Sequence, residues 1–316
     1  MENTYQNANL AKQIMQEVKK AIIGKDRVVE KVMIAILAGG HVLVDDIPGV
    51  GKTTLATAFS KAMNLKQNRV QFTPDVMPSD ITGFSMYNKV KNIFEYREGS
   101  VMCNLFLADE INRTSSKTQS ALLEAMEEGK VTVDGVTREL PRPFTVIATQ
   151  NPVGSIGTQM LPESQLDRFM FCVSMGYPTV LEEIIMLKGK EEGAPLERVE
   201  PVVSIMEVEQ MKQEAEQVFI HDEVYEYIVK LVHATRKSEN ISLGISPRGS
   251  VSITRAARAA AYLKGKDYVS PQEVQEVFAD ACAHRILLSS KARANRKNEM
   301  DVIRQIMQKV VVGKRR

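Results

Sequence analysis

Residues 46–53, Asp46-Ile47-Pro48-Gly49-Val50-Gly51-Lys52-Thr53, decide the fold of this chain. They follow the apolar run Val42-Leu43-Val44 and lead into the helix-forming stretch 55–59. Glycines between a strand and a helix free backbone N–H groups to point at an anion, and the dipole of the helix favours the same negative charge. Lys52 would then reach the β- and γ-phosphates of a nucleotide, and the Thr53 hydroxyl would ligate Mg²⁺.

This stretch departs at one position from the P-loop pattern G-x-x-x-x-G-K-[ST], because Asp46 stands where the pattern has its first glycine. A short G-x-G-K-T run also arises by chance. The stretch alone therefore leaves two interpretations open, a phosphate-binding loop and a glycine-rich structural turn.

The composition predicts a soluble cytoplasmic protein with a large core. The chain has 316 residues, of which 44% are hydrophobic, a length that favours two domains. The net charge of +2 offers no strong field for nucleic acid or an anionic membrane. Three widely spaced cysteines lack metal-ligand spacing and fit buried thiols in a reducing compartment. We find neither a signal peptide nor an apolar run of about 18 residues.

A second diagnostic stretch, residues 104–110, is an apolar strand that ends in the adjacent carboxylates Asp109 and Glu110. In a parallel sheet, ligands gather at the C-terminal ends of the strands. Asp109 would lie where Mg²⁺ binds, through water, and Glu110 could polarise an attacking water. A helix cap or a solvated turn is the alternative for these two residues.

Three further polar residues stand at ends of predicted elements. The strand 144–149 delivers Asn151, whose amide could hold the attacking water or sense a γ-phosphate. Arg168 precedes the strand 169–173 and is either a salt-bridged surface residue or an arginine finger for a neighbour's nucleotide. Arg248 lies at a helix start, against the preference of the dipole, which invites a contact with phosphate.

The remaining segments complete a coarse map of the chain. Residues 73–100 interrupt the strand–helix alternation and predict an insertion with its own small strands. Residues 131–137 alternate strictly around Asp134-Gly135, which predicts a hairpin with a primed turn. From Pro178 onward we expect helices alone, with a linker at 195–201. Ile22 and Ile23 either wall an adenine ring or belong to the core.

Taken together, these residues resemble the AAA+ ATPases and, within them, the MoxR group. The matching stretches follow the chain in order: 46–53, 71–75 with 80–83, 108–113, 117–126, 148–152, 166–169 with 176–178, and 246–248. The resemblance accounts for Asp46, because members of this group commonly carry an acidic residue there.

The resemblance implies an α/β fold. A five-stranded parallel-sheet P-loop AAA+ core would occupy residues 1–200, with a helix-2 insertion at 73–100 and a pre-sensor-1 hairpin at 130–140. An all-α lid domain would follow at 201–316.

The resemblance also implies site roles, with ATP and Mg²⁺ as cofactors. The catalytic residues would be Lys52, Glu110, Asn151 (sensor 1), Arg168 (arginine finger) and Arg248 (sensor 2, in cis or in trans). The nucleotide-binding residues would be Ile23, Gly24, Asp46, Ile47, Pro48, Gly49, Val50, Gly51, Lys52, Thr53 and Thr54. Thr53 and Asp109 would hold the metal.

An arginine finger needs a neighbouring subunit, so the resemblance implies a ring, typically a hexamer. Relatives act as chaperone-like remodellers of clients that carry a von Willebrand factor A domain. Two other functions stay open: a nucleotide-gated binding scaffold with little turnover, and a DNA-dependent motor. The near-neutral charge and the lack of a recognisable DNA-binding module disfavour the motor.

Overall fold

A five-stranded parallel sheet forms the centre of the computed structural model, which describes residues 7–151, 160–191 and 194–311. The strands lie in the order β2-β5-β8-β1-β9. Their bounds are β1 Val42–Asp45, β2 Gln67–Gln71, β5 Leu105–Asp109, β8 Thr145–Gln150 and β9 Phe171–Val173. The five-stranded parallel sheet expected from the resemblance is confirmed.

Alternating side chains of the sheet enter two separate cores. On β1, Val42 and Val44 pack into one core and Leu43 into the other; on β5, Leu107 and Phe106 divide in the same way. All of these side chains are buried, because a parallel sheet in an α/β protein is covered on both faces. This burial explains why the strands read as apolar runs rather than as alternating patterns.

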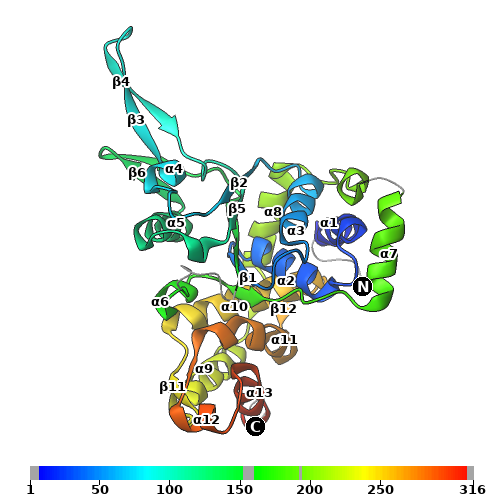
Figure 1. Ribbon diagram of the computed structural model, residues 1–316. Helices are drawn as coiled ribbons and strands as arrows, with labels where there is room; N and C mark the ends of the chain where they lie inside the picture. The colour runs from blue at the N-terminus through cyan, green and yellow to red at the C-terminus, as the bar shows by residue number, and fades with distance from the viewer. Residues whose placement is uncertain (1–6, 152–159, 192–193, 312–316) are drawn as a thin grey trace.

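The helices that precede the C-terminal part surround the sheet or lie at its periphery (Figure 1). Their bounds are α1 Ala8–Ala21, α2 Asp26–Leu37, α3 Lys52–Ala62, α5 Ser116–Glu128, α6 Glu163–Leu166, α7 Val180–Glu191 and α8 Ile205–Glu216. Three short 3-10 helices are η1 Ile111–Arg113, η2 Pro195–Arg198 and η3 Ala283–Arg285. None of the helices in the described part of the chain combines the length and the hydrophobicity needed to span a bilayer.

Both predicted insertions form hairpins that project from the body of the molecule (Figure 1). In the first, α4 (Pro78–Thr82) precedes the antiparallel strands β3 (Gly83–Asn88) and β4 (Ile93–Glu98). In the second, β6 (Lys130–Val133) pairs with β7 (Val136–Glu139). Asp134 and Gly135 have φ angles of 51° and 75°, so the predicted primed turn is confirmed.

The C-terminal part is mainly helical and packs beneath the sheet in Figure 1. Its helices are α9 Asp222–Lys237, α10 Pro247–Leu263, α11 Pro271–Cys282, α12 Ser290–Ala294 and α13 Glu299–Lys309.

The expectation that only helices follow residue 178 is wrong in detail. Two short pairs occur, β10 (Phe219–Ile220) with β12 (Tyr268–Val269) and β11 (Ile241–Leu243) with β13 (Leu287–Leu288). With two or three residues each, these strands carry no readable periodicity. The domain boundary at residue 200 stays a prediction.

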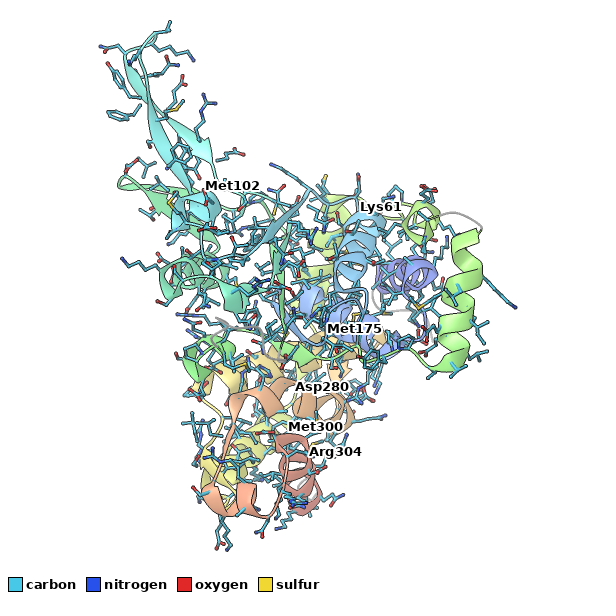
Figure 2. All side chains as sticks on the ribbon, viewed as in Figure 1. Lys61, Met102, Met175, Asp280, Met300 and Arg304 are labelled. Carbon is cyan, nitrogen blue, oxygen red and sulfur yellow. The ribbon has the colours of Figure 1, made fainter. Side chains whose placement is uncertain are left out.

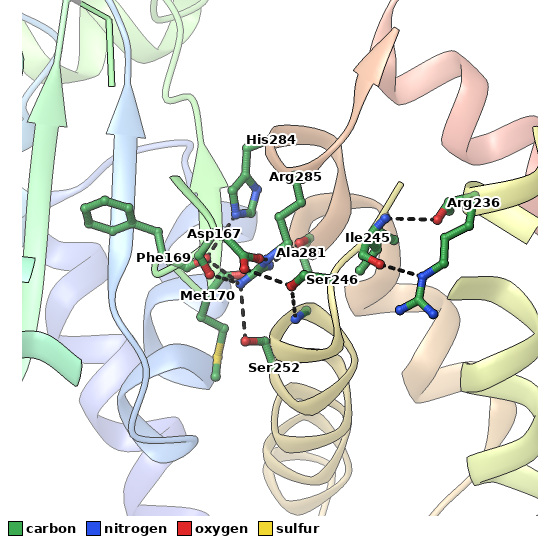
Figure 3. Close-up of polar contacts among 12 residues, drawn as sticks. Asp167, Phe169, Met170, Arg236, Ile245, Ser246, Ser252, Ala281, His284 and Arg285 are labelled. Atoms are coloured by element: carbon green, nitrogen blue, oxygen red, sulfur yellow. Dashed lines mark hydrogen bonds and ion pairs between the residues drawn. The ribbon is translucent and has the colours of Figure 1, made fainter. Parts of the chain in front are cut away.

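Polar contacts tie the C-terminal helices to the sheet domain at several places, two of which involve Asp280 and Arg285. Asp280 of α11, marked in Figure 2, forms ion pairs with Arg27 (3.0 Å) and Lys31 (3.4 Å) of α2. At the second place, which Figure 3 shows, the buried Arg285 donates to Asp167 Oδ1 (2.9 Å) and to the carbonyl oxygen of Phe169 (2.8 Å). We call this second group, Asp167, Ser246 and Arg285, the junction.

Candidate nucleotide site

Residues 46–51 form a loop between β1 and α3 that leaves backbone donors free. Gly49 and Gly51 have φ angles of 83° and 94°, a region that glycine enters without steric cost. Gly51 is the N-cap of α3, and Leu55 is the first residue of the helix whose N–H bonds back, to the Gly51 carbonyl (2.9 Å). Among the described residues, the N–H groups of the first turn therefore stay available to an anion.

Asn151 connects the lysine of this loop with the glutamate that follows β5. Lys52 Nζ donates to Asn151 Oδ1 (2.7 Å), and Asn151 Nδ2 donates to Glu110 Oε1 (2.7 Å). Lys52 Nζ also donates to the carbonyl oxygens of Asp46 and Gln150. Burial lowers the pKa of Lys52, against the opposing effect of the Asp46 and Asp109 carboxylates. Three residues predicted from separate stretches thus form one hydrogen-bonded network.

Asp46, the residue that breaks the motif, holds the loop against the chain that follows β9. Its Oδ2 accepts hydrogen bonds from Ser174 Oγ (3.0 Å), the Met175 N–H and the Gly176 N–H (2.6 Å). Its Oδ1 accepts from the N–H of Ile47 (2.8 Å). Burial alone would raise the pKa of this carboxyl, but the donors outweigh it and hold the pKa below its usual value. A glycine could make none of these side-chain contacts.

Asp109 ends β5 as predicted, and both of its carboxylate oxygens are engaged. Oδ1 accepts from Thr149 Oγ1 (2.6 Å), and Oδ2 forms an ion pair with Arg69 of β2 (2.7 Å). No cluster of three or more His, Cys, Asp or Glu side chains that could hold a metal occurs in the described ranges. A single carboxylate fits Mg²⁺, which is usually held by one or two protein oxygens together with substrate phosphates and water.

The predicted adenine-lining residues lie beside the segment that Asp46 holds. Gly24 has a φ of 72°, and a Cβ added there would lie 1.9 Å from the side chain of Glu182, at the start of α7. The next residue, Lys25, donates from Nζ to the carbonyl oxygen of Tyr177 (3.0 Å). Ile22 is buried, whereas Ile23 is partly exposed. Of the two, Ile23 is therefore the residue that a base could contact.

Arg168 and Arg248 lie side by side, away from the network of Lys52, Asn151 and Glu110. Arg168 Nε donates to Glu127 Oε2 (3.0 Å), and Arg248 donates to Glu127 Oε1. Among the described residues, neither arginine hydrogen-bonds to the loop 46–53 or to Asp109, Glu110 or Asn151. The structure thus groups the predicted catalytic residues into two sets on one chain.

Sequence reasoning missed several residues of these two sets. Arg69, Thr149 and Glu127 contact predicted residues from 40 or more positions away in the chain. Arg113, which pairs with Glu110 (2.6 Å), was missed as well. One pattern in the sequence could have indicated Arg69. Arg69 and Gln71 stand two apart on the strand 67–71, so their side chains lie on the same face of the sheet, at the C-terminal end of the strand.

Comparisons with known proteins agree with this geometry. Residues 41–171 match the family model "ATPase family associated with various cellular activities (AAA)", and residues 233–306 match an AAA lid domain. The chain is 46% identical to the uncharacterized protein YeaC of Bacillus subtilis, over 94% of this chain and 93% of that protein. It is 39% identical to the chaperone MoxR1 of Mycobacterium tuberculosis, over 94% and 80%.

A solved structure resembles almost the whole chain. The crystal structure of a candidate ATPase from Cytophaga hutchinsonii superposes with a TM-score of 0.89. It is 37% identical and covers 98% of this chain and 96% of that one. The sheet, the insertions and the C-terminal helices therefore recur together in a related protein.

Replacing Asp46 by asparagine should destabilise the protein in a pH-dependent way. An amide offers one acceptor to four donors, and an imperfectly satisfied buried group costs about 1–3 kcal/mol of unfolding free energy. The Asp46 pKa is lower in the folded chain, so its stabilisation is present above the unfolded value of about 3.9 and is lost as the pH falls through the folded value.

Thermal unfolding of both proteins at pH 7 and near pH 3 measures this difference. We expect a lower Tm for Asp46→Asn at pH 7 and a gap that narrows in acid. Equal Tm values at pH 7 would show that the hydrogen bonds of Asp46 do not stabilise the loop.

Proposed function

The chain belongs to the MoxR group of AAA+ ATPases, and we propose that it hydrolyses Mg²⁺-bound ATP in a ring of identical subunits and thereby remodels a protein client. One observation carries the proposal: Asn151 joins Lys52, which would bind phosphate, to Glu110, which would activate water. A phosphate-binding loop without catalysis would need no such link.

The proposed reaction is attack of water on the γ-phosphorus of ATP. The bond between that phosphorus and the bridging oxygen breaks, and ADP and phosphate leave. Lys52 and the free N–H groups of α3 bind the phosphates, and Glu110 orients the water and takes its proton. Bound Mg²⁺, held through Thr53 and Asp109, would neutralise charge on the β- and γ-phosphates.

Nucleotide binding should rearrange the network around Asn151. Lys52 Nζ has to exchange some of its three oxygen partners for phosphate oxygens. The hydrogen bond between Lys52 and Asn151 then breaks, and the Asn151 amide becomes free to bind the γ-phosphate or the attacking water. Glu110, held by Asn151 and Arg113 without nucleotide, is released toward the water in the same step.

Arg168 and Arg248 are proposed to act on the nucleotide of a neighbouring subunit. Both pair with Glu127, and within residues 7–151, 160–191 and 194–311 neither is hydrogen-bonded to the Lys52 network. This supports action in trans for Arg248 as well as for Arg168. A positive charge supplied in trans can raise turnover by about 10³ to 10⁵. We therefore expect a ring, a hexamer by analogy with the family, and an isolated subunit with little activity.

The family suggests the client, and the composition suggests the location. We propose that the client carries a von Willebrand factor A domain and that this protein acts in the cytoplasm. The hairpin of β3 and β4 is a suitable contact for a protein, because Val90 and Phe94 near its tip are 96% and 73% exposed. Purification of the protein with its bound partners from the native host would identify the client.

Two alternative functions, a scaffold and a DNA-dependent motor, predict different experimental results. A nucleotide-gated scaffold would bind ATP and assemble without hydrolysing it, but it has no use for the link between Asn151 and Glu110. A DNA-dependent motor would show ATPase activity that rises with added DNA and falls with salt. The net charge of +2 does not favour strong binding to the phosphate backbone of DNA.

Glu110→Gln should bind ATP but hydrolyse it slowly. The amide cannot accept the proton of the attacking water, so phosphate release should fall by about 10²- to 10⁴-fold. ATP affinity, measured by calorimetry, should stay close to that of the wild type. Glu139→Gln, on the exposed strand β7, is the control and should leave both quantities unchanged. Equal phosphate release by wild type and Glu110→Gln would contradict the role of Glu110.

Arg69→Gln should strengthen Mg²⁺ binding to the nucleotide complex. Arg69 places a positive charge 2.7 Å from the carboxylate that would attract the metal. Removing a charge this close should lower the Mg²⁺ concentration for half-maximal ATP affinity by roughly tenfold, by Coulomb's law with effective screening. A Mg²⁺ titration of a fluorescent ATP analogue measures this. An unchanged or higher midpoint would mean that Arg69 does not oppose the metal.

A further inference from the structure

The junction holds the start of α10 against the end of α6. Ser246, the N-cap of α10, donates from Oγ to Asp167 Oδ2 (2.8 Å), while Arg285 donates to Asp167 Oδ1 (2.9 Å). Figure 3 shows these side chains converging from three segments. Arg168 follows Asp167 directly, and Arg248 lies two residues after Ser246. Because Arg285 is only 4% exposed and fully bonded, the junction fixes the spacing of the two arginines.

Glu127, near the end of α5, is the common partner of these two arginines. One carboxylate oxygen accepts from Arg168 and the other from Arg248. The neighbouring Glu128 points to Lys130 instead, at 3.6 Å. The Glu127 side chain is 37% exposed, so an ionic partner from outside the chain can reach it. A single carboxylate thus pairs with both of the arginines proposed to act in trans, and one positive charge remains uncompensated.

A cavity of about 540 Å³ opens beside this group. Glu127, Arg168 and Arg248 line it together with the basic Lys212 of α8 and Arg255 of α10. The acidic residues Glu128, Glu209 and Glu216 line it as well. Phosphate oxygens would find the same charge-assisted donors here that the Glu127 carboxylate now uses. A terminal phosphate carries more negative charge than one carboxylate, so it competes well for two guanidinium groups that are already side by side.

We propose that Glu127 is a positioning residue that holds Arg168 and Arg248 in the unassembled chain and is displaced by the terminal phosphate of a neighbouring subunit's nucleotide. This inference rests on the proposed function, because it needs a ring with nucleotide between subunits. Breaking the two ion pairs is part of the cost of docking a neighbour. Glu127 therefore sets the nucleotide concentration at which the ring forms.

The test is assembly as a function of nucleotide, which does not depend on turnover. Sedimentation velocity with increasing concentrations of adenylyl imidodiphosphate, an ATP analogue with a nitrogen between its β- and γ-phosphorus, would compare wild type, Glu127→Gln and Glu128→Gln. We expect Glu127→Gln to assemble at about three- to tenfold lower analogue concentration, in line with the loss of two partly exposed ion pairs. Glu128→Gln should match the wild type.

A double-mutant comparison separates the contact from a general charge effect. In an Arg248→Ala background one of the two ion pairs is already gone, so Glu127→Gln should shift the midpoint less. An unchanged or higher midpoint for Glu127→Gln, or the same shift with and without Arg248, would overturn the inference. If the wild type neither assembles with the analogue nor hydrolyses ATP, the proposed function fails instead.

Discussion

Three adjacent parallel strands, β1, β8 and β5, end at one edge of the sheet, and their register determines where every residue of the nucleotide network lies. Val44 pairs with Thr149, and Ala108 with Ala148, so the loop after β1, the amide after β8 and the carboxylates at the end of β5 come together. The side chains of these strands are buried on both faces. A shift of register would expose apolar residues to water and would also separate Lys52 from Asn151 and Glu110.

A second constraint acts between the sheet and the C-terminal helices. Arg285 is buried and bonded to Asp167 and to the carbonyl oxygens of Phe169 and Met170, which lead into β9. Asp46 fastens the loop of the nucleotide site to residues 174–176, which follow the same strand. The strand β9 is thus bonded to the nucleotide loop at one end and to the helical part at the other.

The sequence was sufficient to predict the site residues at the ends of strands. It was insufficient to predict the residues that hydrogen-bond to them. Lys52, Asp109, Glu110 and Asn151 follow apolar runs, and parallel strands bring their C-terminal ends together whatever the loops do. Three of the four donors to Asp46 lie 128 to 130 positions away, and Glu127 lies 121 positions from Arg248. Such contacts depend on which strands lie side by side and on how the helices pack, which no local pattern encodes. The short strands β10 to β13 were not predicted for a different reason. A strand of two or three residues is too short to show an alternation of apolar and polar side chains.

We propose that one subunit completes the site of the next, and a mixed-ring experiment can show this. Glu110→Gln subunits keep intact arginines, and Arg168→Ala subunits keep an intact water-activating glutamate. Each variant alone should be nearly inactive. An equal mixture should recover about one quarter of the wild-type ATPase rate if subunits mix at random in a head-to-tail ring. No recovery, with mixed rings verified by native mass spectrometry, would mean that each subunit carries a complete site of its own.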